Sequence, residues 1–286
     1  MKKVSIVGII CLIIAVIVLF MSFKINKDLN GKLQIASKDA IELKDSTILD
    51  KNEGKLVILT GKLSLENEFV SDDELGVKVK TLSLLRNVEM YQWEEDEIEQ
   101  EDLDENPEYE YFAIWSNKLI DSSEYHRSGY NNPKEMPYES KSFYNKLVIG
   151  DFTVSNKLIS KLNTKALNEV ESTNTYDTGL VVDEQYLTSV YSREPHVRDI
   201  RISYKYVDIS KVTDITILAK QVGNTFVEYT YDDQVLGDMW LEKLSKNQVI
   251  EKISEKNTTS RITMYALIGV FTILGIALIM RKRKSV

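Results

Sequence analysis

Residues 4–23 read VSIVGIICLIIAVIVLFMSF, and residues 262–280 read ITMYALIGVFTILGIALIM. Neither stretch contains a charged residue. At about 1.5 Å per residue, a helix of either length crosses a hydrocarbon layer of roughly 30 Å. The two stretches therefore predict transmembrane helices at residues 4–23 and 262–280, with residues 24–261 between them.

The first apolar stretch favours a retained anchor over a cleaved signal peptide. Its apolar run is longer than a usual signal core, and Ser22-Phe23-Lys24-Ile25 offers no small-residue cleavage site. The single cysteine, Cys11, lies inside this stretch. We therefore expect no intramolecular disulfide and assign Cys11 to apolar packing.

Basic residues flank both stretches on their outer sides. The tail at residues 1–3 carries Lys2 and Lys3, and the tail at residues 281–286 carries Arg281-Lys282-Arg283-Lys284. Since positive flanks stay on the cytoplasmic side, both termini are predicted to be cytoplasmic and the central domain extracytosolic. The membrane would be the plasma membrane in a bacterium, and the ER or nuclear envelope in a eukaryote.

The central part of the chain is acidic. It holds all 44 acidic residues and all but six of the 36 basic ones, so residues 24–261 carry a net charge of −14. This charge argues against nucleic-acid binding, which needs a basic surface. Hydrophobic residues make up 43% of the chain, enough to supply a folded core.

Segments rich in β-branched and aromatic residues dominate the central part and predict strands. Helices are predicted at residues 26–49, 156–166 and 237–254, and Val222-Gly223-Asn224 predicts a hairpin turn. The fold class is therefore α+β, a mostly antiparallel β-rich exterior domain flanked by N- and C-terminal transmembrane helices. The predicted strands are residues 55–65, 76–93, 109–120, 146–154, 186–191, 198–207, 215–221 and 225–231.

Residues 94–110 contain eleven acidic residues in seventeen positions. They predict a long solvated hairpin loop that like-charge repulsion keeps extended. A low-affinity divalent-cation site is the alternative interpretation. An EF-hand loop would need a central glycine, and none occurs between Gly76 and Gly129.

The two histidines are the candidates for acid–base or metal chemistry. Neither has a second His or Cys nearby in sequence, whereas zinc sites usually need at least three protein ligands. The sequence contains no nucleophile elbow, phosphate-binding glycine loop or H-E-x-x-H motif. We therefore predict that the chain is not an enzyme, and assign no catalytic, cofactor-binding or metal-binding residue. As general bases, His126 could pair with Glu124 or Glu139, and His196 with Glu194 or Asp199.

Several short motifs occur together in a characteristic order. The most specific is the octapeptide Arg86-Asn-Val-Glu-Met-Tyr-Gln-Trp93. On these motifs the sequence, from about residue 52 to residue 237, resembles the LUMA (transmembrane protein 43) family. The other motifs are Asn52-Glu-Gly-Lys-Leu-Val57, Tyr111 with Trp115, Gly129 to Pro133, Met136, Glu139-Ser140 and Asp199-Ile-Arg-Ile202. The family-motif residues, structural or partner-binding, are Asn52, Glu53, Gly54, Arg86, Glu89, Met90, Tyr91, Gln92, Trp93, Trp115, Asn132, Pro133 and Arg201.

The resemblance implies a membrane-anchored protein with a large non-cytosolic domain and self-association. In animal cells it implies a place in the ER and inner nuclear envelope as a partner of envelope proteins, and no enzymatic activity. Animal members follow the domain with several spans, whereas this chain has one, so contacts within that bundle are not expected to carry over. The family's Gly-His-x-Asn-Pro reads Gly129-Tyr130-Asn131-Asn132-Pro133 here, which weakens any proposal of catalysis or metal binding at that loop.

Alternation along the octapeptide separates its residues into two faces. Val88, Met90 and Gln92 share one face, and Asn87, Glu89, Tyr91 and Trp93 share the other. We interpret the segment as a core strand in which Glu89 pairs with Arg86 or Arg201, and a recognition surface is the alternative. Trp93 and Arg201 are expected to be architectural, Trp93 through a buried ring and Arg201 through a carboxylate partner.

The first functional hypothesis is a two-span membrane scaffold whose extracytosolic domain mediates protein–protein interaction or self-association in membrane or envelope organisation. The alternative is an envelope sensor or transport accessory that responds to a ligand, a cation or a mechanical state. The expected partners are the lipid bilayer, proteins of unknown identity and further copies of the chain in a homo-oligomer. No cofactor or nucleic acid is expected.

Overall fold

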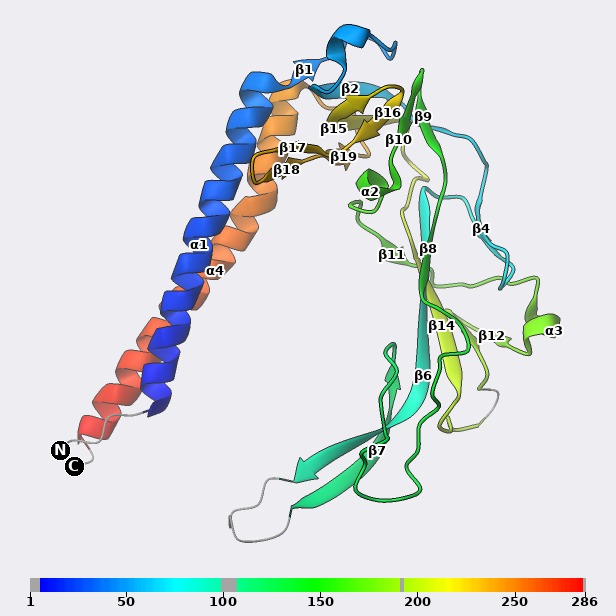
Figure 1. The fold of residues 1–286 in the computed structure, drawn as a ribbon, viewed down its shortest axis with the longest axis vertical. Helices are drawn as coiled ribbons and strands as arrows, with labels where there is room; N and C mark the ends of the chain where they lie inside the picture. The colour runs from blue at the N-terminus through cyan, green and yellow to red at the C-terminus, as the bar shows by residue number, and fades with distance from the viewer. Residues whose placement is uncertain (1–5, 99–106, 191–192, 285–286) are drawn as a thin grey trace. The chain divides into compact units, whose positions relative to one another are not determined.

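The computed structural model describes residues 6–98, 107–190 and 193–284. It has the predicted α+β class, with an N-terminal and a C-terminal candidate membrane helix and a central part rich in antiparallel strands (Figure 1). The chain forms two compact units, each assembled from separate stretches of sequence. Unit 1 comprises residues 1–62, 149–158 and 213–286, and unit 2 comprises residues 63–148 and 159–212.

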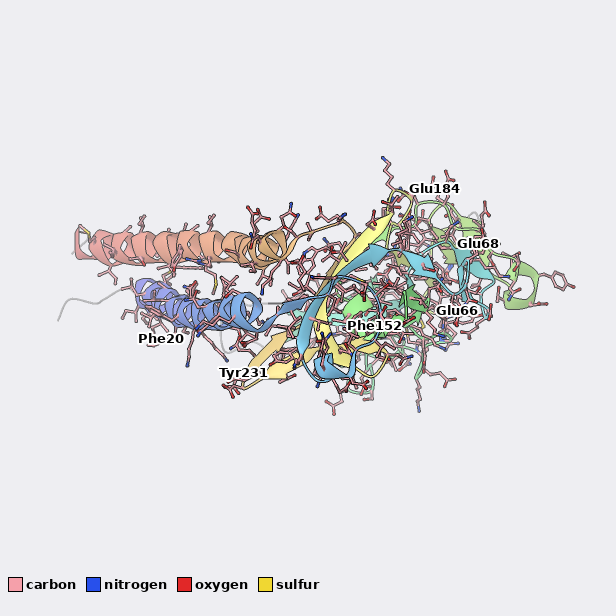
Figure 2. All side chains as sticks on the ribbon, turned by 90° about the horizontal axis from the view of Figure 1, so that it is seen from above. Phe20, Glu66, Glu68, Phe152, Glu184 and Tyr231 are labelled. Carbon is pink, nitrogen blue, oxygen red and sulfur yellow. The ribbon has the colours of Figure 1, made fainter. Side chains whose placement is uncertain are left out.

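Two long helices run side by side in unit 1, α1 (Ile6–Asp39) and α4 (Lys246–Lys284) (Figure 1). Both contain a candidate membrane span, Ile6–Asp39 in α1 and Arg261–Met280 in α4. Most apolar side chains of the two spans are exposed in the isolated chain, as a lipid-facing surface requires. Phe20, for example, is 70% exposed on the side of α1 that faces away from α4 (Figure 2).

A seam of mostly small residues lies where α1 meets α4. The buried residues of α1 include Gly8, Ala15, Ser22, Leu29 and Ala36, which recur every seven residues. This repeat keeps one face of a gently supercoiled helix against its neighbour. A Cβ atom added to Gly8 would lie 2.9 Å from the backbone oxygen of Gly275, and the reverse distance is also 2.9 Å. The glycines therefore let the two backbones approach closely, as in membrane helix pairs generally.

The boundaries of both long helices differ from the predicted ones. The helix predicted over residues 26–49 is the last part of α1, which ends at Asp39 rather than Leu49, and Lys246 Nζ donates to the Ala40 carbonyl (2.6 Å) just beyond its end. The second helix begins at Lys246 rather than Gly237, because Ser245 and Gln248 form a capping box in which Gln248 Oε1 accepts from Ser245 N (2.9 Å).

The sheet of unit 1 packs against these helices. Its strands follow the order β1-β2-β15-β16-β10, and β19 also pairs with β15. The predicted hairpin is confirmed, since Val222 of β15 lies opposite Thr225 of β16 across a two-residue turn. Apolar residues of β2 and β15, such as Ile58 and Leu218, share one core with Leu29 of α1 and Val249 of α4. The membrane helices and the sheet are thus continuous parts of one folded unit.

The elements of unit 1 outside the long helices are short. They are β1 (Ile41–Glu42), the 3-10 helix η1 (Asp50–Asn52), β2 (Leu56–Lys62), β10 (Phe152–Val154), β15 (Asp214–Val222), β16 (Thr225–Val227), β17 (Tyr229–Tyr231), β18 (Gln234–Leu236) and β19 (Asp238–Trp240). The chain passes from one unit to the other four times, after residue 62, within β9 (Leu147–Ile149), at the end of α2 (Asn156–Ile159) and after residue 212.

Unit 2 is organised around an antiparallel sheet with the strand order β12-β13-β14-β6-β7. Its longest strand is β6 (Ser83–Ile98), whose burial alternates along the chain so that Leu84, Val88 and Met90 lie in the core. The other strands are β3 (Ser64–Leu65), β4 (Val70–Asp72), β5 (Val77–Val79), β7 (Glu108–Ser116), β8 (Lys141–Tyr144), β11 (Lys165–Ala166), β12 (Val181–Asp183), β13 (Tyr186–Thr188) and β14 (Ile200–Tyr206), and the helix α3 spans Thr175–Thr178.

Two further predictions for the central part are corrected. The helix expected over residues 156–166 is limited to the four residues of α2, because Lys165 and Ala166 already pair with β14. The acidic segment 94–110 is not entirely a loop, because β6 and β7 stay paired as far as Ile98 and Glu108. Residues 99–106 lie outside the described residues. Among the residues that are described, no three acidic, His or Cys side chains converge as a metal site would require.

The close approach of α1 and α4 leads to a stability prediction. Gly275→Ala should destabilise the chain by about 1–3 kcal/mol, because the added methyl group meets the Gly8 carbonyl. Gly269→Ala is the matched control in the same helix, since a Cβ atom at Gly269 meets nothing within 4 Å. The thermal midpoints of both variants in detergent provide the measurement. Equal midpoints for the two variants would contradict the observed helix contact.

Candidate functional site

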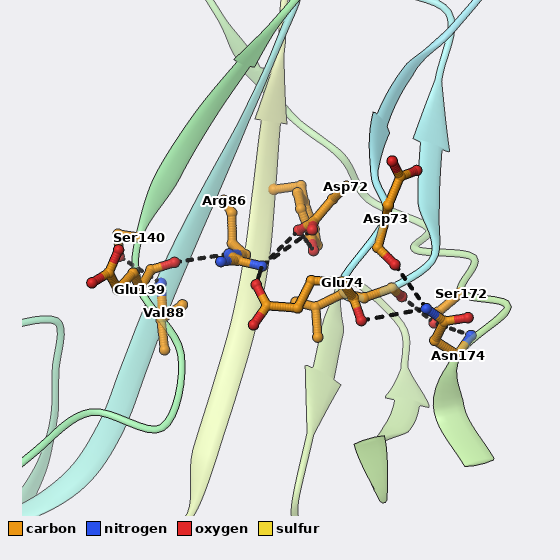
Figure 3. Close-up of polar contacts among 11 residues, drawn as sticks. Asp72, Asp73, Glu74, Arg86, Val88, Glu139, Ser140, Ser172 and Asn174 are labelled. Atoms are coloured by element: carbon orange, nitrogen blue, oxygen red, sulfur yellow. Dashed lines mark hydrogen bonds and ion pairs between the residues drawn. The ribbon is translucent and has the colours of Figure 1, made fainter. Parts of the chain in front are cut away.

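A buried ion pair lies at the centre of unit 2. Arg86, on the inward face of β6, places Nη1 3.0 Å from Asp72 Oδ2 and 2.8 Å from Glu74 Oε2 (Figure 3). The Arg86 and Asp72 side chains are 2% and 0% exposed. Arg86 Nε donates to the Glu139 carbonyl (2.8 Å), and Tyr204 donates its hydroxyl proton to Asp72 Oδ2 (2.7 Å). The two buried charges are therefore paired and hydrogen-bonded.

The electrostatics of this cluster favour the charged pair. Burial alone would lower the pKa of Arg86, but the hydrogen bond to Glu74 and the charge of Asp72 outweigh it and raise the pKa above its ordinary value. Burial and the hydrogen bond to Asp72 raise the pKa of Tyr204 far above its ordinary value, so its hydroxyl stays protonated as a donor. The cluster is therefore suited to holding strands together.

The opposite face of the sheet carries a second ion pair, surrounded by aromatic rings. Arg201 Nε lies 2.8 Å from Glu89 Oε2, and these residues lie opposite each other in β14 and β6. The guanidinium lies 4.6 Å from the ring centroid of Trp115 and 5.2 Å from that of Tyr186. Tyr91 in turn contacts Trp115, with ring centroids 5.2 Å apart. We call these five residues the outer face.

The outer face is only half-buried. The Arg201 side chain is 28% exposed, and that of Glu89 is 21% exposed. The predicted pairing of Glu89 with Arg201 is thus present, whereas Arg86 lies on the inward face and pairs elsewhere. Arginine, tryptophan and tyrosine side chains with residual exposure are the types that dominate protein–protein contacts.

Trp93 belongs to this half-buried side of the sheet rather than to the core. The alternation of β6 directs odd-numbered residues away from the apolar cluster that contains Val88 and Met90. The Trp93 ring meets Tyr130 edge to face with centroids 4.8 Å apart, and Tyr130 stacks on Tyr111 at 3.9 Å. Tyr130 stands at the second position of Gly129-Tyr130-Asn131-Asn132-Pro133, where the resemblance implies a histidine, and it acts there as a packing group.

The segment after β7 is fastened to β6 by side-chain amides. Beyond Tyr91, where pairing with β14 has ended, Asn132 Oδ1 accepts from Trp93 N (2.7 Å) and Asn132 Nδ2 donates to Trp93 O (2.8 Å). Gln92 is fully buried and bonds to the backbone of Lys118 and Ile120 at 2.9 Å each. Asn132 thus takes the place of a neighbouring strand, and Pro133 follows it on the half-buried surface.

Each histidine makes contacts that differ from the predicted ones. His126 pairs with Glu95, not with Glu124 or Glu139, at 2.9 Å from Nδ1 to Oε1. Partial burial alone would raise the pKa of Glu95, but hydrogen bonds from Tyr111 and His126 lower it below its ordinary value.

His196 and Asp199 are connected mainly through Arg193. His196 N donates to Asp199 Oδ2 at 2.6 Å, whereas the imidazole Nδ1 lies 2.6 Å from Arg193 Nη1. The hydrogen bond from Arg193 lowers the pKa of Asp199 to about 2 despite partial burial. The Asp199 carboxylate therefore binds Arg193, and the His196 ring contacts Arg193 rather than the carboxylate expected of a general-base pair.

Asn52, Glu53 and Gly54 lie in unit 1 and are separate from the other motif residues. Gly54 has φ +74°, a left-handed conformation that suits glycine, and its N–H donates to the Gln221 carbonyl (2.9 Å). Glu53 Oε2 accepts from Gly223 N (2.8 Å). This motif therefore fastens the turn between β15 and β16.

Besides a cavity of about 560 Å³ that Asn132 and Pro133 help to line, unit 2 contains another that none of the motif residues lines. It has a volume of about 860 Å³ and is bordered by Leu65, Val79, Lys165, Tyr206 and Asp208 among others. Lys165 Nζ lies 2.6 Å from Asp208 Oδ2, and this contact lowers the pKa of Asp208. The charged groups of the cavity thus pair with each other rather than converge on an empty point.

The structure brings Glu89, Tyr91, Trp115 and Arg201 together, places Met90 in the core, and adds residues that the sequence analysis did not single out. Asp72, Glu74 and Tyr204 were missed. The sequence does contain a signal for them, because Arg86 shares a predicted buried strand face with Leu84 and Val88, and a buried arginine requires a carboxylate partner.

The buried pair generates a prediction about stability. Asp72→Ala removes the buried carboxylate beside Arg86 and leaves the guanidinium with only the half-exposed Glu74, and breaking a buried pair typically costs about 3–5 kcal/mol, or roughly 6–15 °C in the thermal midpoint of a unit of this size. The matched control is Glu89→Ala, which removes the carboxylate of a partly exposed pair and should lower the midpoint much less. Thermal unfolding in detergent compares them, and a similar loss for both variants would contradict the burial of the first pair.

The comparisons with known proteins agree with the motif pattern. The family model described as Transmembrane protein 43 matches residues 90–284. Transmembrane protein 43 of Homo sapiens and of Mus musculus are each 29% identical over 215 residues, which cover 70% of this chain and 52% of either relative. The homolog of Drosophila melanogaster is 25% identical over 191 residues, covering 62% of this chain and 49% of that protein.

The chain spans about half the length of the curated relatives it matches. No solved structure matches it. The matched region contains both the outer-face residue Trp115 and the candidate span in α4. Because the family model covers more than half of the sequence, this integral membrane protein with two candidate spans belongs to the Transmembrane protein 43 family.

Proposed function

We propose that the chain is a two-span membrane scaffold whose central domain binds other proteins or further copies of itself in membrane or envelope organisation. The observation that carries this proposal is the outer face of unit 2, where Arg201 lies between two aromatic rings and keeps 28% of its side chain exposed. Such anchors bind through area and stacking, and need no reactive group.

A non-enzymatic role agrees with the chemistry of the described residues. In unit 2 the buried Arg86 is paired with Asp72, and in the 860 Å³ cavity Lys165 is paired with Asp208. An active site usually presents titratable groups to an open pocket with pKa values near the working pH. The pKa shifts at Asp199, Asp208 and Tyr204 move away from neutrality instead.

Partner capture tests the scaffold proposal. Arg201→Ala should reduce crosslinked partners in native membranes several-fold, because it removes the charge and both stacking contacts at the centre of the outer face. Crosslinking and mass spectrometry measure the loss, and the thermal midpoint in detergent verifies folding. Tyr176→Ala is the control, since Tyr176 is a 96% exposed aromatic residue of the same unit. Unchanged crosslinks for a folded Arg201→Ala variant would remove the basis of the proposal.

The proposal includes an orientation, with both termini in the cytoplasm and the central domain outside it. The support is the positive charge of Lys2 and Lys3 before the first span and of residues 281–284 after the second. An even number of spans makes the two ends agree. The membrane would be the plasma membrane in a bacterium, and the ER or nuclear envelope in a eukaryote.

Cysteine accessibility tests this orientation. In a Cys11→Ala background, a cysteine at Tyr176 should react with a membrane-impermeant maleimide in intact cells or right-side-out vesicles. A cysteine at Ser285 should react only after permeabilisation, because the basic flank holds that end inside. The reverse pattern would invert the proposed orientation.

A further inference from the structure

The outermost strand of the sheet in unit 2 leaves one edge open. β7 ends the strand order β12-β13-β14-β6-β7, and among the described residues no strand other than β6 pairs with it (Figure 1). Nine consecutive residue pairs join β7 to β6, from Met90 with Ser116 to Ile98 with Glu108. This regular register contains no bulge, so both backbones keep a strict alternation.

The register determines which backbone groups of β7 face outward. Tyr91 uses its N–H and carbonyl on the side away from β7, since its N donates to Asp199 O (2.8 Å) and its O accepts from Arg198 N (2.9 Å). Trp93 likewise turns both groups toward Asn132. In an antiparallel ladder the neighbouring residues must then face β7. The β7 residues opposite Tyr91 and Trp93 are Trp115 and Ala113, and their backbone N–H and carbonyl groups therefore face away from β6. By the same alternation, so do the backbone groups of Tyr111 and Tyr109.

These four residues present a row of unused backbone groups. Within the part of the chain that the structure describes, no hydrogen bond reaches their N–H or carbonyl groups from outside the β6–β7 ladder. The row repeats about every 7 Å, twice the rise of a strand residue. Such an edge is a template for a further strand, and exposed edges are normally protected by lysine, proline, a bulge or a covering loop. The β7 sequence EYEYFAIWS contains neither lysine nor proline.

The charges beside this edge select the kind of strand that it accepts. Asp96 lies directly opposite Glu110, and Ile98 opposite Glu108. Among the described residues, Asp96, Glu108 and Glu110 have no cationic partner. Like charges placed opposite each other destabilise a strand pair, so cationic side chains next to Glu108 and Glu110 would relieve this repulsion.

The side chains of an added strand would face two different surfaces. One set would lie beside Glu108, Glu110 and the 38% exposed ring of Phe112. The alternate set would lie beside Tyr111 and Trp115, on the half-buried side of the sheet. The first surface favours basic residues, and the second favours apolar ones.

From this geometry we propose that the free edge of β7 accepts an extended segment of a partner protein in which Lys or Arg alternates with apolar residues. The inference rests on the proposed scaffold function and names the chemistry of its partner. A second copy of β7 is disfavoured as the occupant, because it would bring its own glutamates and no basic residue.

A labelled peptide of sequence Lys-Val-Lys-Val-Lys-Val-Lys, blocked at both ends, is the probe, and the full chain in neutral detergent is the receptor. Fluorescence anisotropy should give saturable binding. The same peptide with Glu in place of Lys should bind at least about tenfold more weakly, and so should Lys-Val-Lys-Pro-Lys-Val-Lys, which keeps the charge but cannot form a regular strand. If the proline peptide bound as tightly as the Lys-Val peptide, binding would depend on charge attraction alone, and the proposal would be overturned.

Ala113→Pro tests the edge itself. Proline removes an N–H that points outward and is not used inside the sheet, so the fold should survive while strand addition is blocked. Ala113→Ser is the matched control, because it keeps the N–H. The probe should bind Ala113→Ser as it binds the wild type, and Ala113→Pro at least about tenfold more weakly. Wild-type affinity in a folded Ala113→Pro variant would overturn strand addition.

Hydrogen exchange supplies a second measurement that does not depend on the proline variant. The probe should slow exchange of the amides of Tyr109, Tyr111, Ala113 and Trp115, and exchange unchanged at saturation would contradict the proposed contact. Self-association of the wild type that Ala113→Pro abolishes would instead identify a second copy as the occupant and overturn the basic partner. If the probe does not bind but Arg201→Ala still loses native partners, only the edge inference fails and the scaffold proposal stands.

Discussion

The strict alternation of β6 is the constraint on which the rest of unit 2 depends. From Leu84 to Trp93 its burial keeps period two, which sorts the side chains into an inner and an outer set. The inner set supplies Val88 and Met90 to the core. It also places Arg86 there, where a carboxylate partner is needed to offset the cost of burying the charge. The outer set supplies Glu89 and Tyr91 to the half-exposed face. The structural and the candidate binding functions of one octapeptide are therefore separated by the pleat alone.

How much of this was predictable depends on the range of the interactions involved. The spans, the α+β class and the turn at Gly223-Asn224 follow from local patterns, and the structure has all three. The predicted start of the helix at residue 237 was wrong because Asp238–Trp240 pair with β15, a partner that apolar spacing cannot reveal, whereas the helix itself is present from Lys246. The pairing of Glu89 with Arg201 was predictable only as one of two choices. Its selection required the register of β14 against β6, which brings together residues 112 positions apart.

The site residues that were missed share one physical cause. Asp72 lies at the end of a three-residue strand, and nothing in its own neighbourhood distinguishes it from Asp73 beside it in sequence. Its role follows only from the requirement that a carboxylate neutralise Arg86 on a buried face. For Trp93 the error had the opposite origin, because a large ring was equated with the core. Its odd-numbered position on the strand already placed it with Glu89 and Tyr91 on the other side.

The separation of the two faces gives a physical reason for a buried ion pair in the core of unit 2. A slip of β6 by one residue against β14 would exchange its two faces, bringing Glu89 into the core and Arg86 to the surface. The apolar residues alone resist such a slip, but moving a paired buried arginine away from Asp72 and Tyr204 adds a cost that hydrophobic packing does not provide. The same register directs the backbone groups of Tyr111 and Ala113 toward the open edge of β7. We therefore infer that the ion pair contributes mainly to the specificity of strand pairing, and that the surfaces available to partners depend on that specificity.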